Sequence, residues 1–84
     1  MKTYFITFRS ITYAQRGEKL LALHGYRCQL RRTPRWMEEK GCGYCLRLKC
    51  EDIGPWVAIL RRRGVAFRRV YIRQPDGEIR EVTV

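Results

Sequence analysis

Two periodicities meet in residues 43–60, which read GYCLRLKCEDIGPWVAIL. From residue 44 to residue 50, apolar residues occupy every second position, which predicts a strand with one apolar and one basic face. From residue 53 onward, apolar residues recur at the i, i+3, i+4, i+7 spacing of an amphipathic helix. Asp52 is placed to cap this helix, Pro55 suits its first turn, and Gly64 follows where a helix that began here would end.

The flanking sequence supplies the remaining elements. Residues 4–8 are aromatic and β-branched and predict a strand. Thr12 and Gln15 have the spacing of a capping box, so a helix is predicted from there to Gly25. Alternation over residues 26–30 predicts a second strand, and residues 65–73 predict a fourth. Residues 74–77 (Gln-Pro-Asp-Gly) have the chemistry of a tight turn, and residues 78–84 can form a short last strand.

The predicted order is β-α-β-β-α-β with one further strand. Two β-α-β-like halves of this length predict an α+β fold, specifically a ferredoxin-like βαββαβ sandwich with a C-terminal β-hairpin extension. We expect a single domain over residues 1–84, with a core over 3–73 and the hairpin strand at 78–84. Two helices should cover one face of the sheet and leave the other open to solvent.

Size and composition exclude several classes of protein. The chain has 84 residues, a formal net charge of +10 and 12% aromatic residues, so it can bury a core but is too small for a large enzyme or several domains. No apolar run approaches the roughly 18 residues needed to span a bilayer. The first eight residues resemble a strand and not a signal peptide. We therefore expect a cytoplasmic protein that does not contact a membrane.

Four cysteines, Cys28, Cys42, Cys45 and Cys50, are the most distinctive side chains. In a cytoplasmic chain they are not expected to form a disulfide framework. Cys42 lies between Gly41 and Gly43, which let the backbone approach a bound group. Nearby cations lower the pKa of a thiol, and the candidates are Arg35, Lys40 and Arg47. This setting favours a nucleophilic or sulfur-carrying Cys42 over a structural one.

The chain resembles a known family, the selenium/sulfur carrier-like family of small domains, over about residues 4–73. The similarity lies in residues 4–8, in the helix with Ala14 and residues 18–21, in the triplet Thr33-Pro34-Arg35, and in Cys42-Gly43 leading into residues 46–48. The resemblance implies a carrier that holds sulfur or selenium as a persulfide or perselenide on Cys42. It also implies that Arg35 orients the carried group or a partner.

The same resemblance implies a cysteine desulfurase or a selenium-transfer protein as the partner, and a carrier in place of an independent enzyme. Two features depart from the family pattern. Residues 36–41 replace a serine-rich approach to the cysteine, and Cys45 stands where a small residue other than cysteine is usual. Cys45 is therefore either a resolving thiol or a plain small-residue substitute. Because it shares a strand face with Arg47 and Lys49, we expect it to be exposed.

The charge of +10 supports an alternative function. A basic sheet face on such a fold resembles a platform for single-stranded RNA, on which aromatic side chains stack bases. Tyr44, Trp36 and Tyr71 are the stacking candidates. The candidate basic surface comprises Arg27, Arg31, Arg32, Arg47, Lys49, Arg68 and Arg69. The same charge could equally serve an acidic partner protein or reflect only the base composition of the genome.

Metal binding is the third alternative. Cys45 and Cys50 should lie on opposite faces of one strand, so they cannot converge on one tetrahedral ion, and Cys28 and Cys50 are expected to pack as small apolar residues. We therefore expect no metal or other cofactor, although a zinc-bound dimer joined through CxxC pairs stays open as an alternative. A homodimer is also compatible with an unpaired edge strand. No pair of acidic residues and no Ser/His/Asp set suggests independent catalysis.

Overall fold

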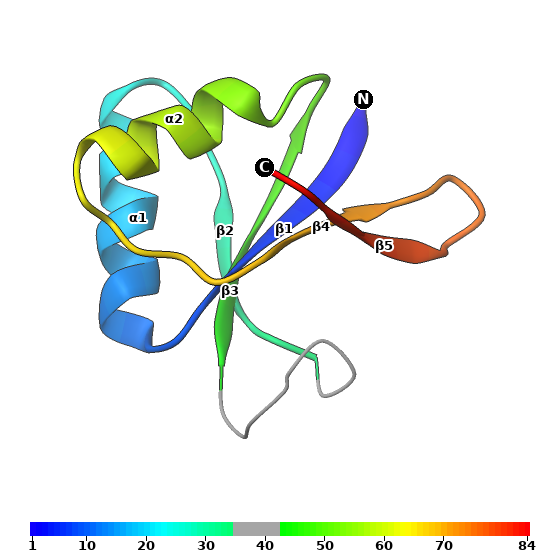
Figure 1. Ribbon diagram of the computed structural model, residues 1–84, viewed down its shortest axis with the longest axis horizontal. Helices are drawn as coiled ribbons and strands as arrows, with labels where there is room; N and C mark the ends of the chain where they lie inside the picture. Colours follow the sequence, from blue (N-terminus) through cyan, green and yellow to red (C-terminus); the bar gives the residue numbers. More distant parts are fainter. Residues whose placement is uncertain (35–42) are drawn as a thin grey trace.

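The computed structural model describes residues 1–34 and 43–84. They form an α+β domain in which an antiparallel sheet of five strands packs against two helices (Figure 1). The elements are β1 (Lys2–Phe8), α1 (Ile11–Leu23), β2 (Gln29–Arg32), β3 (Tyr44–Cys50), α2 (Gly54–Arg62), β4 (Val70–Arg73) and β5 (Ile79–Val82). The predicted order of helices and strands is confirmed. No helix in the described part of the chain is long and apolar enough to cross a membrane.

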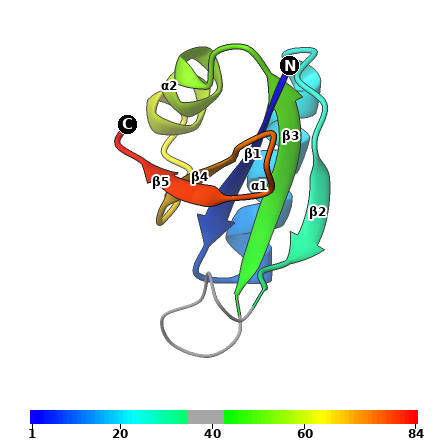
Figure 2. The same ribbon diagram turned by 90° about the vertical axis from the view of Figure 1, so that its right-hand side faces the viewer.

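The strands lie in the order β2-β3-β1-β4-β5, so the first strand of the chain is at the centre of the sheet. Every neighbouring pair is antiparallel. Each helix connects two strands that are not neighbours, and both helices pack on the same face of the sheet, as Figures 1 and 2 show together. The β4–β5 hairpin projects away from the helices. The expectation of one covered and one open face is therefore confirmed.

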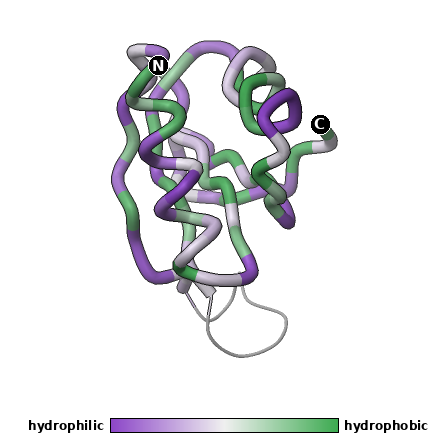
Figure 3. The backbone as a smooth tube through the Cα atoms, turned by 90° about the vertical axis from the view of Figure 1, so that its left-hand side faces the viewer, coloured by the Kyte–Doolittle hydropathy of each residue, from purple (hydrophilic) through white to green (hydrophobic). Residues whose placement is uncertain are grey.

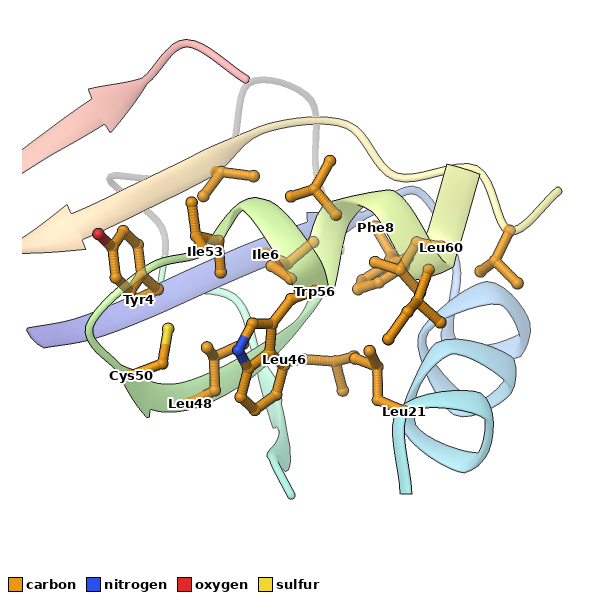
Figure 4. Close-up of a cluster of buried hydrophobic side chains, with 14 of the residues drawn as sticks. Tyr4, Ile6, Phe8, Leu21, Leu46, Leu48, Cys50, Ile53, Trp56 and Leu60 are labelled. Carbon is orange, nitrogen blue, oxygen red and sulfur yellow. The ribbon is translucent and has the colours of Figure 1, made fainter. Parts of the chain in front are cut away.

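The main core lies between the helices and the sheet (Figure 4). Ile6 and Leu46 on the two central strands, Leu21 on α1 and Leu60 on α2 have no exposed surface. Alternation places these strand residues on one face, while their neighbours in sequence point to the other face. The tube in Figure 3 shows the consequence, because hydrophobic and hydrophilic residues alternate along the elements instead of forming long blocks.

Helix α1 begins earlier than the sequence pattern predicts. Its N-cap is Ser10, whose Oγ accepts a hydrogen bond of 3.4 Å from the backbone N–H of Tyr13, so the prediction of a cap at Thr12 is wrong. Gly17 faces the sheet, and a Cβ built on it would lie 3.2 Å from Cζ of Phe8. The missing side chain therefore allows the helix to approach β1 closely. Gly25 follows the helix with φ of +81°, as a glycine after a helix end commonly does.

Helix α2 confirms the predicted Pro55 and Gly64 signals, but its N-cap is Ile53, without a side-chain capping bond, and not Asp52. The Asp52 carboxylate accepts a hydrogen bond of 2.9 Å from the backbone N–H of Gly54, and Pro55 lies in the first turn. This carboxylate satisfies one of the free N–H groups at the helix start. Gly64 adopts φ of +72° immediately after the last turn.

Two predicted strands are shorter in the structure. The strand expected from Tyr26 begins only at Gln29, and the strand expected from residue 65 begins only at Val70. For the second difference the cause is visible at Thr7. The Thr7 N–H donates to the carbonyl of Arg69 while its carbonyl accepts from the N–H of Arg68, so two residues oppose one, as in a β-bulge. Regular pairing resumes at Val70.

Candidate functional site

The candidate site lies where β2 leaves the sheet and β3 re-enters it. The backbone N–H of Thr33 donates a hydrogen bond of 3.0 Å to the carbonyl of Gly43, directly beyond the register pair Arg32 and Tyr44. This hydrogen bond closes a stem, and Pro34 and Gly43 are its last described residues on either side. Four residues predicted to act here lie outside the described residues: Arg35, Lys40, Gly41 and Cys42. Their roles stay predictions.

Gly43 serves the stem by close packing. A Cβ built on Gly43 would lie 3.3 Å from Oγ1 of Thr33 and 3.6 Å from the carbonyl oxygen of Phe8. The glycines with positive φ in the described chain lie elsewhere, so Gly43 is required for space and not for an unusual backbone conformation. Any larger residue would have to push the Thr33 side chain aside.

Thr33 carries a buried hydroxyl. The residue is only 4% exposed, and among residues 1–34 and 43–84 its Oγ1 has no hydrogen-bond partner of standard geometry. A buried hydroxyl without a partner usually costs free energy. Thr7, the other buried threonine, differs because its Oγ1 both donates to the carbonyl of Arg69 and accepts from the N–H of Arg69.

Cys45 lies on the open face of the sheet but is buried, with 1% of its surface exposed. The expectation that it is exposed is therefore wrong. Its side chain lies on the face of β3 that points away from the helices, as predicted. Phe5 packs with it, and Tyr71 and Ile79 lie against this pair. The β4–β5 hairpin supplies these last two residues. The alternation of apolar and basic residues along β3 could not predict this cover, because it comes from a distant part of the chain.

Burial raises the pKa of the Cys45 thiol above its ordinary value. A weak interaction with the Thr33 hydroxyl and the positive charge of Arg31 act in the opposite direction, but burial is the largest effect. The thiol therefore stays protonated near neutral pH, whereas the thiolate is the nucleophile in sulfur chemistry. Its role as a resolving thiol stays a prediction, which burial and protonation disfavour.

The other two described cysteines are also poor nucleophiles. Burial and the nearby charge of Glu18 raise the pKa of Cys28 to about 11. Cys50 belongs to the main core, and burial is the largest cause of its raised pKa. Both pack as small apolar residues, as predicted. Among residues 1–34 and 43–84, no three His, Cys, Asp or Glu side chains are placed to hold a metal ion.

The predicted basic residues separate onto different surfaces. Arg47 points to the open face and donates a hydrogen bond of 3.2 Å to Oε1 of Gln29. Arg32 instead lies over the ring of Tyr44, 5.7 Å from its centroid, and Tyr44 packs against the main core. Tyr44 therefore does not belong to the open face, and the prediction that it stacks on bases there is wrong. Of the other two stacking candidates, Trp36 lies outside the described residues, and Tyr71 lies opposite Phe5 on the open face.

Fold and site together define a class: a small α+β domain in which a closed stem joins two strands, with Cys45 of the CxxC pair on the second of these strands. The family model described as putative Se/S carrier protein-like matches residues 3–72, and the chain belongs to this family. The match includes Thr33, Pro34, the stem and all four cysteines. No curated protein and no solved structure matches the chain.

Proposed function

We propose that this protein is a cytoplasmic carrier of sulfur or selenium and that Cys42 holds the cargo as a persulfide or perselenide. The family assignment over residues 3–72 supports the class of function. The observation that favours Cys42 is that the thiols of the other three cysteines are protonated near neutral pH. Each of Cys28, Cys45 and Cys50 has its pKa raised, with burial as the largest cause, so none of them presents a thiolate near neutral pH.

The proposed transfer needs only a thiolate and a donor persulfide. The Cys42 thiolate attacks the outer sulfur of the donor persulfide, the sulfur–sulfur bond of the donor breaks, and the donor cysteine leaves as a thiolate. The outer sulfur is then bonded to Cys42. An acceptor nucleophile attacks the same sulfur and releases the Cys42 thiolate again. No external oxidant or reductant is required, because each step exchanges one bond to the transferred sulfur for another.

Fold and partners complete the proposal. The strand order β2-β3-β1-β4, with one helix before β2 and one before β4, supports a ferredoxin-like sandwich with β5 as an extension. A cysteine desulfurase or a selenium-transfer protein would load the carrier. Arg35, Lys40 and Arg47 would attract the charged groups, and the stem at Thr33 and Gly43 would anchor both ends of the connection.

The test is loading with a cysteine desulfurase and cysteine in the absence of reductant, followed by intact and peptide-mapped mass spectrometry. We expect one added sulfur on the peptide containing Cys42, removable by a thiol reductant. Cys42→Ser should abolish the adduct, and Cys45→Ser should keep it. Selenocysteine with a selenium-delivering enzyme is the second donor. A folded protein that takes up no sulfur or selenium from several donors would refute the proposal.

A further inference from the structure

The open face of the sheet presents a defined row of side chains across all five strands. Residues directly opposite each other in neighbouring strands are Gln29 on β2, Arg47 on β3, Phe5 on β1, Tyr71 on β4 and Glu81 on β5. Neighbouring strands lie about 4.8 Å apart, so the row combines an amide, a guanidinium and two aromatic rings within a short span. The row ends in the Glu81 carboxylate, which forms an ion pair of 3.3 Å with Arg69. Phe5 is buried, whereas Tyr71 packs against it and is only half-buried.

Positive charge surrounds this row. Arg31 lies on the same side of β2 as Gln29, and Lys49 lies two residues from Arg47 on β3. Arg73 follows Tyr71 on the same face of β4, with its guanidinium 5.4 Å from the centroid of the Phe5 ring. At the outer edge, Arg27 and Lys49 line a hollow of about 490 Å³ together with Gln29 and Arg47.

Within residues 1–34 and 43–84, these cations are not paired with acidic side chains. Within the parts of the chain that the structure describes, no carboxylate forms an ion pair with Arg27, Arg31, Arg47, Lys49 or Arg73. Arg31 and Arg47 instead both donate to the neutral Oε1 of Gln29, at 3.3 Å and 3.2 Å. Two guanidinium groups therefore converge on one uncharged acceptor and keep their full charge available for an anion.

We propose that this open face binds single-stranded nucleic acid, with Arg31, Arg47, Lys49 and Arg73 contacting phosphates and Tyr71 stacking on a base. A positively charged surface that includes an accessible aromatic ring is the combination that recognises an unpaired strand, because the backbone is anionic and each base has a flat apolar face. An acidic protein would need the cations but not the ring, so the row containing Tyr71 favours nucleic acid. The proposal is independent of sulfur or selenium transfer.

The test measures the fluorescence anisotropy of labelled single strands of about 12 nucleotides, a length within the usual range of such sites. RNA and DNA of one sequence are compared, with an RNA duplex as competitor. The charge variant is Arg47→Gln/Lys49→Gln. Its control is Arg62→Gln/Arg63→Gln, which removes the same charge at the end of α2, on the helix-covered side. Circular dichroism checks that each variant is folded.

We expect the charge variant to weaken binding at least tenfold and the control to change it less than twofold. Each phosphate contact contributes about 0.7 to the salt dependence for single strands, so losing two contacts should lower the slope by about 1.4. Tyr71→Leu, which keeps apolar bulk against Phe5, should weaken binding about tenfold without changing the slope. The duplex should compete poorly. Preference for RNA or for DNA identifies the natural ligand.

Three results would overturn the proposal. Equal weakening by the charge variant and its control would mean that net charge alone causes binding. Equal competition by the duplex would mean that only backbone charge is recognised. Binding of polyglutamate as tight as that of RNA, together with no effect of Tyr71→Leu, would assign the face to an acidic protein partner.

Discussion

The two faces of the sheet use the same strands but bury their residues by different means. On the helix-covered face, Ile6 and Leu46 belong to the core beneath the two helices and have no exposed surface. On the open face, Phe5 and Cys45 are nearly as buried, yet their cover comes from Tyr71 and Ile79 of the β4–β5 hairpin. Burial on the first face therefore follows from the alternating pattern, whereas burial on the second also depends on a distant hairpin.

The largest expected effect is on the free energy of unfolding, which should fall much more for a substitution on the helix-covered face than for one on the open face. Leu46→Ala leaves a cavity beneath both helices, because Leu46 is fully buried. Such changes lower the free energy of unfolding by about 2–5 kcal/mol. The adjacent Arg47→Ala, on the open face, should change the free energy of unfolding by less than about 1 kcal/mol, because Arg47 is only partly buried and makes one hydrogen bond to a neutral acceptor. Urea denaturation measures the free energy of unfolding of both variants. Similar losses in the two variants would contradict the difference in burial between the two faces.

The two buried threonines give a matched second test. Thr7→Val removes two hydrogen bonds with Arg69 and leaves the Arg69 carbonyl and N–H with one partner fewer. We expect a loss of about 1–3 kcal/mol in the free energy of unfolding. Thr33→Val removes a hydroxyl that has no hydrogen-bond partner of standard geometry among the described residues, only a weak interaction with the Cys45 thiol, so stability should stay constant or rise.

Urea titrations also measure the free energy of unfolding of Thr7→Val and Thr33→Val. A clear loss in Thr33→Val would mean that its hydroxyl has a partner in solution. If Thr33→Val keeps its stability but loads less sulfur on Cys42, the hydroxyl serves the carrier connection and not the fold.

The smallest effect concerns pH. The pKa of Cys28 rises from an ordinary value of 9.0 to about 11 in the folded protein, through burial and the charge of Glu18. The unfolded chain therefore releases this proton first, and stability that is complete below pH 9 is lost between pH 9 and pH 11. Cys28→Ala should make this loss less steep. Thermal unfolding at several pH values tests it, and an unchanged slope would contradict the assigned pKa.

The reactivity of Cys45 gives an independent check that the open face buries this residue. Iodoacetamide near neutral pH should modify Cys45 only slowly, because the thiol is both inaccessible and protonated. Peptide mapping after unfolding in urea provides the control, since all cysteines should then react. Rapid labelling of Cys45 in the folded protein would show that the hairpin does not cover it in solution.

The sequence by itself determined the order of elements, because each switch of apolar period marks a strand or a helix and each glycine or proline marks an end. It also determined the packing of Cys28 and Cys50 and the face of each β3 residue, since alternation decides both. Together with the family resemblance, it pointed to Cys42 as the residue to test. These features depend on residues close together in the chain.

Only the tertiary structure decided the features that depend on distant residues. The bulge opposite Thr7 shortens the fourth strand, and the stem bond from Thr33 to Gly43 explains the glycine at residue 43. Cys45 is the clearest case. Its neighbours in sequence suggest exposure, yet it is buried in a cluster with Phe5, against which Tyr71 and Ile79 pack. Burial depends on every segment that packs against a residue, so the pattern of residues along one strand could not predict it.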